Sequence, residues 1–139
     1  MFDRYFTDDE VRIEYQREFI SLWPGWLGKE NYHHLEEVTE YDWAKFNSLI
    51  RIISKSYKVQ VVDLKGRKII DVNNIEQTFS TYEDSMKKAS SDFSIYVIPE
   101  LDFILSEDWD YTFIVWYKNK SVIDILKPFL EKCGLFHFS

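Results

Sequence analysis

The chain has 139 residues, of which 45% are hydrophobic and 18% aromatic, with four glycines and three prolines. Such a length is typical of one domain, and the apolar fraction excludes a disordered chain. The 24 acidic and 17 basic residues give a net charge of -7, which disfavours direct binding to nucleic acid. We expect one globular domain over residues 1-139, whose acidity either attracts a basic partner or serves only solubility.

The start of the chain, MFDRYFTDDEV, lacks the basic region and apolar run of a signal peptide. No segment has the ~20 apolar residues that span a bilayer. Cys133 is the only cysteine, so no internal disulfide can form. These features predict a cytoplasmic protein that does not enter the membrane.

The first predicted element is a helix that begins at Thr7. The sequence from Thr7 to Glu10 has the spacing of a capping box, with acids in the first turn. Apolar residues then recur at helical spacing, at Val11, Tyr15, Phe19 and Leu22. Pro24 and Gly25 end the pattern, and Trp23 and Trp26 are expected to anchor the following loop against the core.

A helix over residues 39–54 follows, capped by Thr39, with an apolar stripe at Trp43, Phe46, Ile50 and Ile53. Residues 57–72 read as a β-hairpin that turns at Lys65-Gly66. A short helix is predicted from Ser80, as its cap, through Ala89.

Residues 93–98 and 101–105 are predicted strands, and Pro99 ends the first of them. The segment from Tyr111 to Tyr117 is apolar on both faces, which predicts a central, buried strand. Ser121 is expected to cap a final helix that Gly134 closes, and a short last strand follows. Runs of strands with short turns predict an α+β fold of two layers, with a mostly antiparallel sheet and helices on one face.

Two groups of side chains invite a metal-site interpretation. His33-His34 precedes Glu36-Glu37, but adjacent histidines diverge on a regular helix or strand, so a surface loop is favoured. Asp108 and Asp110 form a DxD pattern, but no complete ligand set or zinc spacing accompanies it. No cofactor or metal is expected.

A catalytic centre is not evident either. Cys133 and His137 are separated by a glycine, and Cys133 completes an apolar helix stripe, so it reads as a structural residue. Phosphate-binding glycine loops and nucleophile elbows are absent from the sequence. The chain is therefore not expected to be an enzyme.

An acidic and aromatic surface remains the best candidate for function. Acids steer a basic partner, while aromatic side chains provide the buried anchors of an interface. The predicted partner-binding residues are Glu100, Asp102, Glu107, Asp108, Trp109 and Asp110. The alternative is an ordinary acidic turn, and the other acidic groups to consider are Asp8-Asp9-Glu10 and Glu36-Glu37-Glu40-Asp42.

The C-terminal third, DYTFIVWYKNKSVIDILKPFLEKCGLFHF preceded by IPELDFILSEDW, resembles the ends of small bacterial immunity proteins of polymorphic and contact-dependent inhibition toxin systems. The resemblance implies a cytoplasmic inhibitor that binds one cognate toxin domain, commonly a basic nuclease, and it maps no individual site residue. Two other hypotheses stay open: a small metal-dependent enzyme that uses Asp108 and Asp110, and a protein-binding adaptor of unrelated function.

Overall fold

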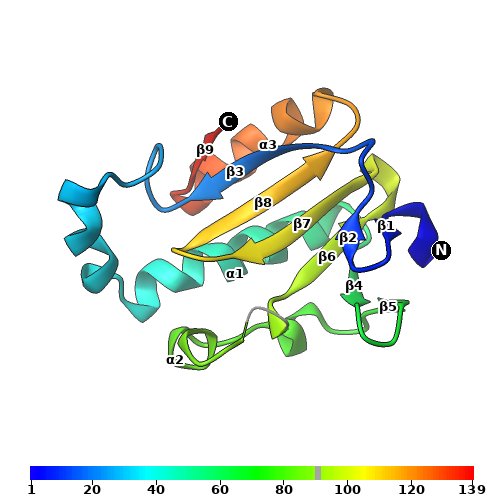
Figure 1. Ribbon diagram of the computed structural model, residues 1–139, viewed down its shortest axis with the longest axis horizontal. Helices are drawn as coiled ribbons and strands as arrows, with labels where there is room; N and C mark the ends of the chain where they lie inside the picture. Colours follow the sequence, from blue (N-terminus) through cyan, green and yellow to red (C-terminus); the bar gives the residue numbers. More distant parts are fainter. Residues whose placement is uncertain (90–91) are drawn as a thin grey trace.

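The computed structural model describes residues 1–89 and 92–139 (Figure 1). Its strands are β1 (Phe6–Thr7), β2 (Glu10–Val11), β3 (Gln16–Ser21), β4 (Gln60–Asp63), β5 (Lys68–Asp71), β6 (Ile95–Ile98), β7 (Phe103–Asp108), β8 (Thr112–Tyr117) and β9 (Phe136–Phe138). Its α-helices are α1 (Glu40–Ser56), α2 (Tyr82–Met86) and α3 (Ser121–Cys133). Short 3-10 helices are η1 (Phe2–Arg4), η2 (Lys29–Glu37), η3 (Ile75–Thr78) and η5 (Pro99–Leu101).

The main sheet has seven strands in the order β5-β4-β6-β7-β8-β3-β9, and every recorded pair is antiparallel. The predicted antiparallel α+β fold is therefore confirmed. β8 lies inside the sheet and pairs with β7 on one side and β3 on the other. This position explains why the segment is apolar on both faces, as the sequence indicated.

Helices α1 and α3 cover one face of the sheet, behind the strands in Figure 1. The buried stripe of α1 packs on the inward residues of β8, and the rings of Phe46 and Phe113 are stacked with centroids 5.0 Å apart. Val122, Leu126 and Leu130 of α3 extend the same core. The prediction that helices occupy one face is confirmed.

The N-terminal segment covers part of the opposite face, and the predicted helix from Thr7 to Leu22 is wrong. This segment instead forms the β1–β2 hairpin and then β3. Asp8 has a φ of 56°, a left-handed conformation that aspartate tolerates, so the acidic run makes a tight turn rather than a helix cap. Phe6 and Tyr15 pack there against Ile104 of β7, forming a second, smaller core.

Most local predictions for the other elements hold. α1 begins after Thr39, whose backbone N–H donates to Asp42 Oδ2 at 3.1 Å in a capping box. The hairpin of β4 and β5 forms as expected. α2 is shorter than predicted and is capped by Thr81 rather than Ser80. α3 is capped at its start by Lys120 rather than Ser121, and Gly134 follows its last residue with a φ of 72° that suits a residue without a side chain.

The two loop tryptophans differ from each other. Trp23 packs against the core and meets Tyr111 edge-on, as predicted. Trp26 is 60% exposed and contacts Phe19 and Phe138 on the outer face of the sheet, so the prediction that it anchors the loop against the core is wrong. Among the helices that the structure describes, none is long and apolar enough to cross a membrane.

Truncation of Phe113 tests the packing between β8 and α1. We expect Phe113→Ala to lower the free energy of unfolding by roughly 3–5 kcal/mol, because the buried ring leaves a cavity against Phe46. Denaturant unfolding followed by circular dichroism measures the change. Ile13→Ala, at a 97% exposed position, is the matched control and should change little. A wild-type midpoint for Phe113→Ala would contradict this packing.

Candidate functional site

The predicted partner-binding acids lie at opposite ends of β7. Glu100 and Asp102 precede the strand. Asp108 is its last residue, and Asp110 follows it. Six residues of strand separate the two groups by about 20 Å. Asp102 accepts a 2.7 Å hydrogen bond from Tyr15 Oη and lies 3.4 Å from Arg4 Nη2, so it ties down the N-terminal segment. The six predicted residues therefore do not form one continuous surface.

Glu107 is buried rather than exposed, with 8% of its surface accessible. Its Oε1 accepts a hydrogen bond from Lys88 Nζ at 3.1 Å and another from the Ser94 backbone N–H at 2.9 Å. These bonds satisfy a charge that would otherwise be costly to bury. Glu107 thus holds β7 to the segment before β6 and does not offer its charge to a partner.

The turn between β7 and β8 has an unusual backbone. Asp110 and Tyr111 both have a φ of 57°, a left-handed conformation that is rare for a bulky residue such as tyrosine. The Tyr111 side chain compensates, because it is buried against Trp23 and Trp43. Its hydroxyl lies 2.8 Å from that of Tyr82, and burial with this hydrogen bond raises the pKa of Tyr111. The turn is therefore fixed by its own buried side chain.

This fixed turn presents Trp109 to solvent. The indole is 59% exposed, and its only recorded aromatic contact within the described residues is an edge-on one with Phe93, 4.8 Å between centroids. What distinguishes Trp109 from other exposed apolar residues is that it borders two hollows of the surface, and tryptophan is enriched among the residues that anchor interfaces. Trp109 is therefore the side chain of the predicted set that is best placed to anchor a partner.

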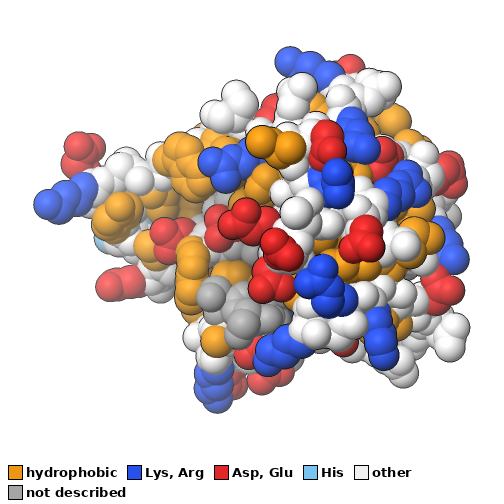
Figure 2. Space-filling model, turned by 45° about the vertical axis from the view of Figure 1, so that its right-hand side comes forward, with side chains coloured by type: hydrophobic (Ala, Val, Ile, Leu, Met, Phe, Trp, Pro, Cys, Tyr) orange, Lys and Arg blue, Asp and Glu red, His pale blue; other side chains and the backbone are white. Residues whose placement is uncertain are grey.

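A groove of about 520 Å³ runs beside Trp109 on the face away from α1 and α3. Most of its lining is apolar, including Trp109, Ile114 and Trp116, and we call it the acidic groove because Asp9, Glu10 and Asp108 also line it. The β1–β2 hairpin supplies the first two acids, and β7 and β8 supply the rest. Figure 2 shows acidic side chains beside hydrophobic ones near the middle of its view. The fold thus joins two acidic groups that the sequence places almost 100 residues apart.

A smaller pocket of about 200 Å³ adjoins the other side of Trp109. Leu35 and Met86 line it together with Asp108 and Asp110. Ser85 also borders it, but its hydroxyl is buried and has no hydrogen-bond partner among the residues that the structure describes. A group entering this pocket from a partner would gain apolar contact with Leu35 and Met86.

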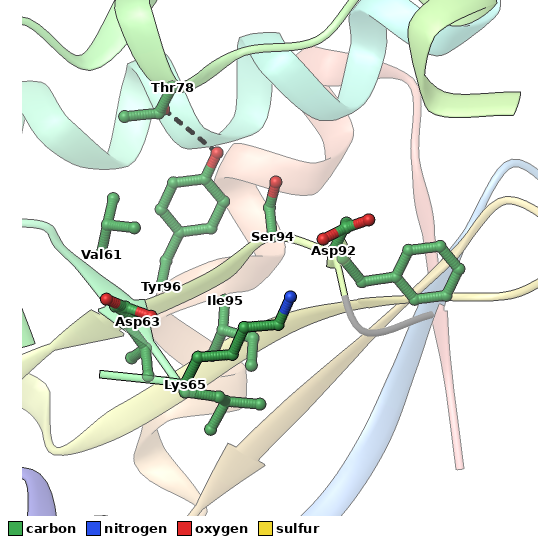
Figure 3. Close-up of a pocket in the computed structure, with 11 residues that line it drawn as sticks. Val61, Asp63, Lys65, Thr78, Asp92, Ser94, Ile95 and Tyr96 are labelled. Carbon is green, nitrogen blue, oxygen red and sulfur yellow. Dashed lines mark hydrogen bonds between the residues drawn. The ribbon is translucent and has the colours of Figure 1, made fainter. Parts of the chain in front are cut away.

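A third hollow, of about 320 Å³, lies where β4 and β6 separate (Figure 3). The two strands pair only through Gln60–Val97 and Val61–Tyr96, so the sheet opens beyond these pairs. Tyr96, whose pKa is raised by burial, is 3.1 Å from Thr78 Oγ1. The described lining contains neither an imidazole nor a thiol. The Ser94 hydroxyl of this lining accepts a 3.3 Å hydrogen bond from Lys88 Nζ.

A buried carboxylate, phenol and imidazole meet near the C-terminus, and the sequence did not indicate their contact. Glu18 of β3 accepts a hydrogen bond from Tyr117 of β8 and pairs with His137 of β9. Burial raises the pKa of Glu18, but the two hydrogen bonds outweigh it, so this pKa lies below its ordinary value. The bond to Glu18, together with burial, raises the pKa of Tyr117 to about 12. We read the cluster as a structural tie between three strands.

The other candidates for chemistry remain apart. His137 faces Glu18, and no hydrogen bond joins it to Cys133 in the described chain. Burial raises the pKa of the Cys133 thiol, which disfavours a reactive thiolate despite the nearby Arg51. Asp108 and Asp110 belong to no group of three potential metal ligands among the described residues.

Comparisons of the chain with protein-family models, curated proteins and solved structures found no match.

The Glu18 cluster makes stability depend on pH. Because folding lowers the pKa of Glu18, its contribution is present above the ordinary value of 4.5 and is lost as pH falls through the lower folded value. Glu18→Gln should lower the free energy of unfolding by roughly 1–3 kcal/mol at pH 7. The variant should also lose less stability than the wild type between about pH 5 and pH 3. Denaturant unfolding across this pH range measures both effects.

Glu131→Gln is the control, since this exposed side chain on α3 has no recorded hydrogen bond. This variant should lose stability at acid pH to the same extent as the wild type. If Glu18→Gln and the wild type lose stability in parallel below pH 5, the carboxylate is not the group that titrates.

Proposed function

We propose that this protein is a non-catalytic inhibitor of the immunity-protein class, which binds a basic toxin domain through the acidic groove and Trp109. The observation that carries the proposal is the rigid hairpin turn, which holds an exposed tryptophan between acids from two distant parts of the chain. In this proposal the protein acts in the cytoplasm and needs no cofactor.

The fixed turn favours tight binding. Tyr111 is locked by its hydroxyl contact with Tyr82 and by the surrounding rings, so the backbone that carries Trp109 is ordered before any partner arrives. A preorganised anchor avoids part of the entropy lost on association. Tryptophan is also among the residues that most often dominate the binding energy of interfaces.

Charge points to the chemistry of the partner. Asp9 and Glu10 are exposed, Asp108 is half-buried, and all three border the acidic groove of a chain with a net charge of -7. Such a surface complements a basic domain and speeds its approach. A nuclease has a basic groove for phosphate, and an acidic inhibitor that occupied this groove would exclude the nucleic acid.

Immunity proteins of this class are encoded beside the toxin that they neutralise. The proposal is therefore tested with the C-terminal domain of the protein encoded immediately upstream, as the candidate toxin domain. We expect this chain to co-purify with the domain and to abolish its toxicity when both are produced in one cell. Binding without loss of toxicity would favour an adaptor instead. A domain that is neither bound nor inhibited would contradict the proposal.

Charge reversal in the groove should slow association. We expect Asp9→Lys with Asp108→Lys to lower the association rate of the toxin domain, because rim charges act mainly on encounter. Surface plasmon resonance at two salt concentrations measures the association rate. Added salt should lower the association rate of the wild-type protein, since charges are screened beyond ~10 Å at 0.1 M. Asp124→Lys with Glu131→Lys on α3 is the charge-matched control. Equal association rates for both double variants would place the interface elsewhere.

Removal of the anchor should act on dissociation instead. Trp109→Ala is expected to raise the dissociation rate and weaken binding by ~2 kcal/mol or more, without unfolding the exposed turn. Tyr41→Ala, at a 78% exposed aromatic residue on α1, is the matched control and should bind like the wild type. If Trp109→Ala dissociates from the toxin domain at the wild-type rate, this residue is not an anchor.

A further inference from the structure

Three potential metal ligands converge on η2, which lies between β3 and α1 at the left of Figure 1. His33, His34 and Glu37 each offer one ligand atom, and these atoms lie within 4.8 Å of one another. The two imidazole rings are 4.1 Å apart between centroids, so the sequence-based argument that they diverge does not hold. The main ground for expecting no metal at these histidines is thereby removed.

The spacing suits a small divalent ion. Zinc binds imidazole nitrogen and carboxylate oxygen at about 2.0–2.2 Å, which places neighbouring ligand atoms roughly 3.4 Å apart in a tetrahedral site. His34 Nδ1 and Glu37 Oε2 are already 3.2 Å apart. His33 and Glu37 are exposed and His34 is half-buried, so small rotations of these side chains can close the remaining distance.

The helix has little other support, namely the half-buried Leu35 side chain against the main core and a 3.4 Å hydrogen bond from Tyr111 Oη to the Leu35 carbonyl. η2 is a 3-10 helix of nine residues with no buried residue and no side-chain hydrogen bond at its N-cap. Runs of this helix type longer than three or four residues are uncommon, because their hydrogen-bond geometry is poor. An ion held by positions 33, 34 and 37 would bridge one turn and stabilise the segment without burying any apolar surface.

We propose that His33, His34 and Glu37 form a zinc site that holds η2 in its 3-10 conformation. The ligand set favours zinc over magnesium or calcium, which prefer all-oxygen sites. Three protein ligands leave the fourth position to water. None of the three borders the acidic groove, so the site stands independently of the proposed inhibitor function.

The test uses the chain without a histidine tag. Isothermal titration with zinc chloride, confirmed by competition with a fluorescent zinc chelator, should give one ion per chain. Zinc should raise the melting temperature, EDTA should reverse the rise, and magnesium should cause none.

Single substitutions identify the ligands. His33→Ala, His34→Ala and Glu37→Gln should each weaken zinc binding at least about tenfold, a loss of 1.4 kcal/mol or more. They should keep the wild-type circular dichroism spectrum in the absence of zinc, since none of the three substituted side chains is fully buried. Glu36→Gln, on the same helix but outside the cluster, is the matched control and should bind like the wild type, as should Cys133→Ser.

Two outcomes overturn the proposal. One is the absence of saturable zinc binding, which would leave the contact between His34 and Glu37 as a hydrogen bond alone. The other is wild-type affinity in all three ligand variants, which would place the zinc elsewhere on the chain.

Discussion

The pairing of β8 between β7 and β3 is the constraint on which the rest of the structure depends. A strand that is apolar on both faces must be covered on both, and its two edges must be hydrogen-bonded. α1 and α3 cover one face through Phe113 and its neighbours. The N-terminal hairpin covers part of the other, where Trp116 joins the smaller core. β3 can pair with β8 only because the segment Gln16–Ser21 is extended rather than helical.

The same hairpin of β7 and β8 connects stability to the candidate interface. Its inner residues belong to the main core, while its turn carries the exposed Trp109. Tyr111 connects Trp109 in the turn to the core residues of β8. Its backbone is left-handed, and its buried ring and hydroxyl contact stabilise this strained conformation. A binding residue is thereby held by the core rather than by a mobile loop, which lowers the entropy cost of engaging a partner.

The N-terminal helix is the clearest failure of prediction, and its cause is specific. The spacing of Val11, Tyr15 and Phe19 fits a helix, but it does not exclude a turn followed by a strand. Phe19 and Ile20 are neighbours that point to opposite faces of β3, where one packs on Phe138 and the other in the main core. Strand propensity depends on such context, because it measures packing against partners distant in sequence.

The sequence by itself determined the elements whose signals are local. The capping box at Thr39, the stripe of α1, the hairpin of β4 and β5 and the glycine after α3 each depend on residues within a few positions of one another. Only the tertiary structure decided which distant side chains meet. It placed Asp9 and Asp108 along one groove, paired Glu18 with His137, and moved Glu107 from the expected surface into an ion pair. These contacts follow from strand order and register, which a local pattern does not encode because many pairings satisfy the same alternation.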